Sequence, residues 1–142
     1  WGNYFRDHHV GRGLWTMDVN RDGKTDLVLT HTKEQLRLLV NRTENAGKSI
    51  GFQIKGTTCS RDAIGATIQF TCKDQSRTLW LLAGDGYMCA NEKILRAGLG
   101  DATQVENVSI TWPDGKTEQV GTLKTGTDYL LVQGKPAFNL ND

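Results

Sequence analysis

The sequence predicts an all-β protein, in which an antiparallel β-sandwich of about seven strands follows a shorter β-hairpin segment with an acidic turn. Three observations predict this fold class. Glycine is abundant, at 16 of 142 residues, while hydrophobic residues make up only 37%, a balance typical of short strands joined by turns. Apolar and polar residues alternate with a period of two in several short stretches. No stretch of ten or more residues has the apolar spacing and end signals of a helix.

Charge and cysteine content narrow the function classes. With 17 basic and 16 acidic residues, the net charge is +1, so we expect no nucleic-acid partner. No apolar run approaches the roughly 20 residues needed to span a bilayer, and we expect no membrane insertion. Cys59, Cys72 and Cys89 lack a C-x-x-C spacing, which disfavours a cysteine zinc site and leaves their pairing open. Because the chain begins at Trp1, we expect it to be a piece of a longer polypeptide.

The first segment, residues 1–42, is expected to hold strands at 13–17, 26–31 and 36–41. In the last of these, Leu36, Leu38 and Val40 share one face, and such a small sheet needs another surface to pack on. Residues 43–49 are polar, lack periodicity, and are the predicted linker.

The acidic turn at 18–26 has the spacing of a calcium loop. Oxygen-bearing side chains occupy its positions 1, 3, 5 and 9, position 6 is glycine, and the carbonyl of position 7 is the usual further ligand. Ca²⁺ takes six to eight oxygen ligands, and a tight loop can direct alternate residues inward to supply them. Gly23 allows the sharp turn. The candidate ligands are Asp18, Asn20, Asp22, Lys24 through its carbonyl, and Asp26.

This loop differs from the calcium loop of a helix–loop–helix EF-hand. Its position 12 is Leu29 instead of the bidentate glutamate that an EF-hand requires, and Leu27–Thr30 has the composition of a strand. With three carboxylates around it and no reactive side chain adjoining, the ion is expected to be structural. The alternative is a solvated Asp/Gly turn between two strands.

Residues 50–134 carry regularly spaced strand patterns, and residues 135–142 are expected to be a C-terminal tail. The residues at 64–73 alternate cleanly, and 77–83 is apolar on both faces around Trp80, which predicts a central strand with Trp80 in the core. Trp112 alternates with Val108 and Ile110 and is also predicted to be core. The remaining strands are expected near 50–54, 93–99, 107–112, 117–120 and 129–133, with a hairpin turn at Trp112-Pro113-Asp114-Gly115-Lys116.

A few side chains outside the acidic turn are weaker candidates for contacts with a ligand. Tyr87 lies in a glycine-rich turn and is a candidate surface contact. Arg61 and Asp62 are weaker candidates, because a structural turn or ion pair before the strand is the favoured interpretation of this pair. His8 and His9 are expected to be solvated and not metal ligands, and His31 is expected to face solvent at a strand end. No Gly-x-Ser-x-Gly elbow is present.

Several blocks resemble known families. The stretch from Gly11-Arg12-Gly13 to Asp26-Leu27-Val28-Leu29-Thr30 resembles an FG-GAP repeat, a blade of the integrin-α type propeller with a calcium-binding loop. The rest resembles the ASPIC/UnbV domain, which follows such repeats in secreted and surface proteins. Its matching blocks are Arg61-Asp62-Ala63-Ile64-Gly65-Ala66, Gly84-Asp85-Gly86-Tyr87, Gly98-Leu99-Gly100-Asp101-Ala102 and Trp112-Pro113-Asp114-Gly115-Lys116.

The resemblance implies a function without catalysis. The repeat's calcium ligands fall on the five acidic-turn positions named above, and the ASPIC/UnbV family offers no catalytic residue to transfer. We therefore expect a secreted or cell-surface module that binds Ca²⁺ and recognises an extracellular protein or glycan partner, as in cell adhesion. The alternative is an accessory domain of a secreted enzyme whose active site lies outside these residues. One repeat alone cannot close a propeller ring.

Overall fold

The computed structural model describes residues 3–141 and is all-β, as predicted. Trp1, Gly2 and Asp142, at the ends of the expected first segment and tail, lie outside the described residues. Within those described, the only helical element is the short 3₁₀ helix η1 (Tyr4–Arg6), and no helix is long and apolar enough to cross a membrane. The chain divides into two compact units, Trp1–Ala46 with Gly84–Glu92, and Gly47–Ala83 with Lys93–Asp142.

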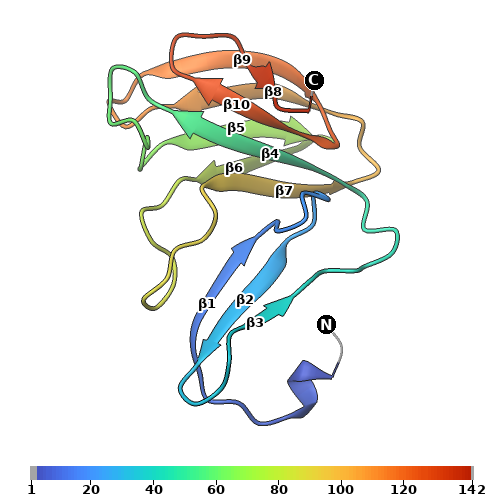
Figure 1. Cartoon of the computed structure of the whole chain (residues 1–142). Helices are drawn as coiled ribbons and strands as arrows, with labels where there is room; N and C mark the ends of the chain where they lie inside the picture. Colours follow the sequence, from blue (N-terminus) through green and yellow to red (C-terminus); the bar gives the residue numbers. More distant parts are fainter. Residues whose placement is uncertain (1–2, 142) are drawn as a thin grey trace. The chain divides into compact units, whose positions relative to one another are not determined.

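The first unit is built on a three-stranded antiparallel sheet in the order β1-β2-β3 (Figure 1). β1 spans Gly11–Met17, β2 spans Asp26–His31 as predicted, and β3 is limited to Arg37–Leu39. Val28 and Leu29 on the central strand are buried, whereas Leu36 and Leu38 are 55% and 43% exposed. The face that the alternation marked as apolar therefore stays largely open to solvent.

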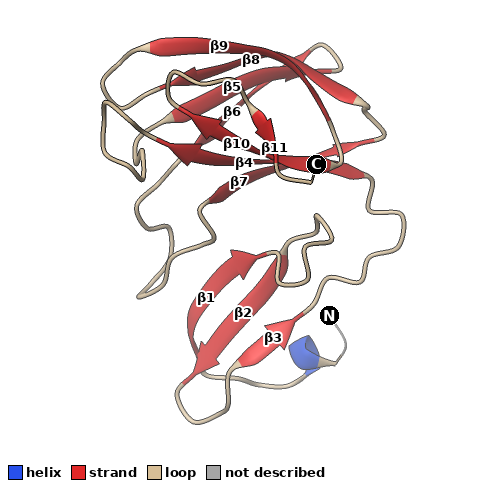
Figure 2. Ribbon diagram, turned by 45° about the horizontal axis from the view of Figure 1, so that its top comes forward, coloured by secondary structure: helices blue, strands red, loops and turns tan. Residues whose placement is uncertain are grey.

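The second unit is a sandwich of two four-stranded sheets, ordered β11-β10-β4-β7 and β6-β5-β8-β9. Figure 2 shows these strands as two layers. The bounds of the strands are β4 Lys48–Lys55, β5 Thr67–Cys72, β6 Gln75–Trp80, β7 Ile94–Gly100, β8 Gln104–Thr111, β9 Thr117–Lys124, β10 Thr127–Val132 and β11 Phe138–Asn139.

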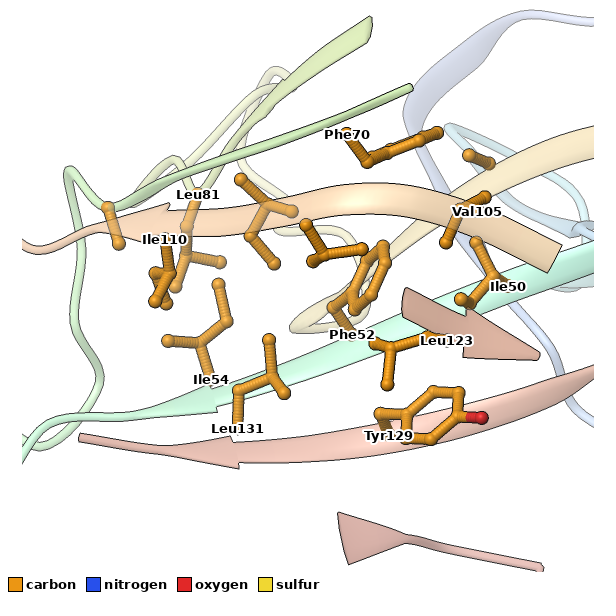
Figure 3. Close-up of a cluster of buried hydrophobic side chains, with 14 of the residues drawn as sticks. Ile50, Phe52, Ile54, Phe70, Leu81, Val105, Ile110, Leu123, Tyr129 and Leu131 are labelled. Carbon is orange, nitrogen blue, oxygen red and sulfur yellow. The ribbon is translucent and has the colours of Figure 1, made fainter. Parts of the chain in front are cut away.

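The core of the sandwich is filled by the inward faces of both sheets (Figure 3). Phe52 on β4 and Phe70 on β5 meet across it, with ring centroids 6.0 Å apart. Ile50, Ile68 and Val105 have no exposed surface. Because each of these residues alternates with a polar neighbour, the period-two pattern fixes which face of each strand is buried.

One strand pair departs from the antiparallel arrangement. β10 pairs with β4 in parallel, with Tyr129 opposite Phe52, and the short β11 then adds to β10. β4 begins at Lys48, inside the stretch expected to be a linker, and β11 lies inside the expected tail. The pairing direction depends on how the chain returns to the sheet, and this information is absent from the alternation of side chains.

The prediction that a strand covers residues 64–73 is wrong over its first three residues. Ala63 and Gly65 have φ angles of +48° and +95°, which are turn conformations, and β5 starts only at Thr67. Two turn hydrogen bonds shape this region, Ala63 N–H to Ser60 O and Ala66 N–H to Ala63 O. Ala66 is nevertheless fully buried. The apolar pattern therefore predicted the burial of this residue correctly but not its backbone conformation.

The prediction of a central strand around Trp80 is also wrong. β6 lies at the edge of its sheet, paired with β5 alone, and Trp80 is 60% exposed. Its neighbours Leu79 and Leu81 are partly and almost completely buried, respectively, and pack on the core. Successive side chains of extended chain point to opposite faces. With the two leucines pointing inward, the indole between them therefore points outward.

The hairpin between β8 and β9 forms at the predicted turn. Gly115 N–H donates to Trp112 O at 2.9 Å across the central residues Pro113 and Asp114, and Gly115 takes a φ of +85°. Lys116 N–H donates to the carboxylate of Asp114 at 3.1 Å, and this hydrogen bond lowers the pKa of Asp114. Trp112 is 2% exposed, which confirms its place in the core.

A partly buried ion pair links β7 to β10 across β4. Two Arg96 nitrogens lie 2.8 and 2.9 Å from the two Asp128 oxygens, a bidentate arrangement. The pair lies over Gly51 of β4, where an added Cβ atom would be 2.2 Å from Asp128 Oδ1 and 3.0 Å from Ile94 Cγ2. Only a residue without a side chain leaves room for this bridge.

We expect Gly51→Ala to destabilise the sandwich by about 1–3 kcal/mol, the usual scale of overpacking, because the methyl group displaces Asp128 from Arg96. Gly98→Ala is the matched control, since Gly98 lies in the neighbouring strand β7 and nothing would lie within 4 Å of its Cβ. Urea unfolding of both variants measures the difference. Equal stability of the two variants would contradict the steric explanation.

Candidate functional site

The acidic turn lies between β1 and β2 in the first unit. The pairing of Met17 with Asp26 brings the two ends of residues 18–25 together, so the segment forms a closed loop at the end of a hairpin. Arg21 and Gly23 have φ angles of +57° and +80°, which the tight reversal requires. The hairpin register alone therefore gathers the candidate ligands into one loop.

Asp18 organises the middle of the loop. Its carboxylate is buried, at 6% exposure, and accepts hydrogen bonds from Asp22 N–H at 3.0 Å and Gly23 N–H at 2.8 Å. Because a carboxylate oxygen has two lone-pair directions, accepting one N–H leaves capacity for a cation. Asp18 thus shapes the turn through both of its carboxylate oxygens.

Asp26 closes the loop and is completely buried. One of its oxygens accepts Val19 N–H at 3.0 Å, and the other accepts Asn41 N–H at 2.7 Å. A buried charge is stable only when it is paired or well hydrogen-bonded, and these two bonds provide part of that compensation. They also connect the start of the loop with the chain that follows β3.

The remaining candidate ligands are on the solvent side. Asn20 Nδ2 donates to Asp22 Oδ2 at 3.0 Å, and Lys24 N–H donates to Asp22 Oδ1 at 2.9 Å. The Lys24 ammonium lies 3.8 Å from Asp22, where it screens the exposed carboxylate. Asp22 is therefore held within the loop by its own neighbours.

The chemistry of the donor set fits a hard cation. All five positions offer oxygen, from three carboxylates, one amide and one backbone carbonyl, which suits Ca²⁺ and is poor for the softer transition metals. Two of the three carboxylates, those of Asp18 and Asp26, are buried within nine residues of chain. Their negative charges repel one another unless a positive charge lies nearby. The loop is thus suited to Ca²⁺ by both ligand type and charge.

A residue that the sequence did not reveal adds a fourth carboxylate at the loop. Glu92 Oε2 accepts Asp18 N–H at 3.2 Å, Glu92 N–H donates to Thr16 O at 3.0 Å, and the side chain of Asn91 accepts Thr16 N–H at 2.7 Å. Glu92 is separated from Asp18 by 74 positions, and no motif or spacing points to it.

These contacts make Gly84–Glu92 part of the first unit, although the sequence analysis placed it in the sandwich. Cys89 adds a further link, since its thiol lies 3.0 Å from Leu14 O on β1. The excursion between β6 and β7 thus lines the β1 edge of the three-stranded sheet.

The weaker candidates belong to different units. Tyr87 is in the first unit and is 66% exposed, as expected for a surface contact. Arg61 and Asp62 are in the second unit, where Arg61 O accepts Gly56 N–H at 3.1 Å and Asp62 lies 3.6 Å from Lys55 Nζ. The latter two therefore take part in a turn and an ion pair. All three cysteines are free thiols in this structure.

We expect Asp26→Ala to lower the free energy of unfolding of the calcium-free protein by about 2–4 kcal/mol, because it removes a fully buried side chain and the acceptor of two part-buried N–H groups. Asp22→Ala is the matched control and should lower it by about 1 kcal/mol or less, because Asp22 is exposed. Denaturant unfolding followed by tryptophan fluorescence compares the variants. Equal losses would show that burial of Asp26 has no energetic consequence.

Comparison with known proteins identifies the family. Residues 56–137, more than half of the chain, match the family described as ASPIC and UnbV. Cartilage acidic protein 1 of Mus musculus is 31% identical over 109 residues, and its Homo sapiens counterpart is 30% identical over 109 residues. Each alignment covers 75% of this chain but only 17% and 16% of those relatives, so the chain spans less than a fifth of their length. On this evidence the chain belongs to the ASPIC and UnbV family.

Proposed function

We propose that this chain is a non-catalytic, calcium-binding interaction module of an extracellular protein, in which an FG-GAP-type blade carries the ion. The observation that carries the proposal is the burial of Asp18 and Asp26 in one nine-residue loop whose donors are all oxygen. Bound Ca²⁺ neutralises these carboxylates and fixes the turn. The same ion then fixes the strand pair β1–β2 that the turn joins.

Extracellular placement is part of the proposal. It is supported by the similarity to cartilage acidic protein 1, whose name associates that protein with cartilage. Millimolar extracellular Ca²⁺ also suits a site of modest affinity, which is common in extracellular modules.

The segment 84–92 supports a role in partner binding. Tyr87 and Met88 are 66% and 88% exposed, and Met88 has a φ of +51°. Exposed tyrosine and methionine are enriched where proteins bind one another, and a tyrosine ring can also stack on a sugar. Because Glu92 in the same segment bonds to Asp18, calcium in the loop also steadies this segment. Partner binding through Tyr87 is therefore proposed to depend on Ca²⁺.

We expect Ca²⁺ to raise the melting temperature of the chain, with a stabilisation of about 2.7 kcal/mol at a concentration 100 times the dissociation constant. Scanning calorimetry with Ca²⁺, with Mg²⁺ and with a chelator measures this. Asp22→Asn should reduce the shift, whereas Asp7→Asn, an exposed change outside the loop in the same unit, should retain it. A melting temperature indifferent to Ca²⁺ and chelator would refute the calcium site.

We expect partner binding, found by screening extracellular-matrix proteins and glycan arrays with Ca²⁺ present, to weaken at least about tenfold in Tyr87→Ala, the scale of an interface hot spot. Trp80→Ala is the matched control, an exposed aromatic residue on the edge strand of the other unit. Partner binding that is unchanged both by a chelator and by Tyr87→Ala would contradict the proposed dependence of recognition on Ca²⁺ and Tyr87. Binding lost equally in both variants would reject segment 84–92 as the contact.

A further inference from the structure

A second group of candidate metal ligands lies at the other end of the β1–β2 hairpin. His9, His31 and Glu34 each offer one ligand atom, and these atoms lie within 4.8 Å of one another. The register explains the meeting, because Gly11 pairs with His31 and Thr32 N–H donates to Val10 O at 3.0 Å. The chain before β1 is thereby held beside the turn that follows β2.

Both histidine rings are oriented by backbone carbonyls. His9 Nε2 lies 3.0 Å from Tyr4 O, and His31 Nδ1 lies 3.3 Å from Gln35 O. A carbonyl only accepts hydrogen bonds, so these nitrogens carry hydrogen and the opposite nitrogen of each neutral ring presents a lone pair. Metal-binding histidines almost always have this arrangement, in which a second hydrogen bond fixes ring and tautomer.

The free side of His9 faces a carboxylate. Its Nδ1 lies 2.9 and 3.1 Å from the two oxygens of Glu34. The position between His9 Nδ1 and Glu34 can be taken by a hydrogen on the ring or by a metal ion, according to the tautomer. The two side chains thus already direct their ligand atoms toward one another.

Tyr4 closes one side of this group. Its ring stacks on that of His9, with centroids 4.3 Å apart and planes 2° from parallel, and its hydroxyl lies 2.6 Å from His31 Nε2. Both histidines are half-buried and Glu34 is at the surface. With hydrogen on His31 Nδ1, the Tyr4 hydroxyl donates to Nε2, so an ion bound there replaces this hydrogen bond.

We propose that His9, His31 and Glu34 form a binding site for Zn²⁺ or a similar divalent transition metal. Two imidazoles and one carboxylate are a zinc donor set, with the fourth tetrahedral position left to water. Zinc–ligand bonds of about 2.0–2.2 Å place tetrahedral ligands roughly 3.3–3.6 Å apart. His9 Nδ1 and Glu34, now 2.9 Å apart at their shortest contact, therefore separate slightly around the ion, and the ligand atom of His31, which lies within 4.8 Å of both, moves inward. This site is distinct from the all-oxygen acidic turn in both position and metal preference. The bound ion connects His9, in the segment that follows η1, with His31 at the end of β2 and Glu34 in the turn between β2 and β3.

The test is calorimetric titration of tag-free, calcium-loaded protein with Zn²⁺ alone. We expect one Zn²⁺ per chain. His9→Gln, His31→Gln and Glu34→Gln should each weaken binding by at least about tenfold, a loss that even second-shell changes reach. His8→Gln is the matched control, because His8 is exposed and adjacent to His9 but outside the group, and it should bind as the parent does.

Metal-free melting curves of every variant verify that the first unit is folded, and Glu34→Gln, a surface change, keeps the test valid if a histidine variant does not fold. Co²⁺ substitution gives an independent readout, for which we expect the visible absorption of a tetrahedral nitrogen–oxygen site. The inference is overturned by the absence of stoichiometric Zn²⁺ binding. Equal loss in His8→Gln, or a sulfur-to-cobalt charge-transfer band from the cysteines, also overturns it.

Discussion

The first unit depends on keeping the carboxylate of Asp26 buried. This side chain has no exposed surface, yet it holds Val19 N–H at the start of the acidic turn and Asn41 N–H beyond β3. A three-stranded sheet of this size buries few apolar side chains, so a larger part of its stability comes from polar contacts. Asp18 is buried in the same loop, so two carboxylates are shielded from water within nine residues. Loop rigidity and the proposed binding of Ca²⁺ thus depend on one arrangement of these two side chains.

Segment 84–92 shows how long-range contacts complete this unit. Asn91 and Glu92 bond to Thr16 and Asp18, residues that precede them by 75 and 74 positions. The backbone bond from Glu92 N–H to Thr16 O lies on the open edge of β1, where unpaired strand groups are otherwise available to other chains. The segment between β6 and β7 therefore protects the β1 edge of the three-stranded sheet and supplies a carboxylate beside the acidic turn.

The sandwich is organised by steric fit as much as by hydrophobicity. The inward residues of both sheets, with Phe52 and Phe70 at their meeting point, form one continuous core. On the other face of β4, the absence of a side chain at Gly51 lets Arg96 and Asp128 meet over the strand. The glycine thus allows an ion pair that connects β7 to β10.

Much of this molecule was determined by local sequence. Period-two alternation identified the buried faces around Phe52, Phe70 and Val108, the turn residues located the hairpin at Gly115, and the spacing of acidic residues located the candidate calcium loop, because each is a property of neighbouring residues. Tertiary structure alone decided the parallel pairing of β10 with β4 and the edge position of β6 that exposes Trp80. It alone brought Glu92 to Asp18 and His9 to His31 and Glu34. These outcomes depend on which strands become neighbours, a choice made by the packing of the whole chain and not by the short-range pattern of any one segment.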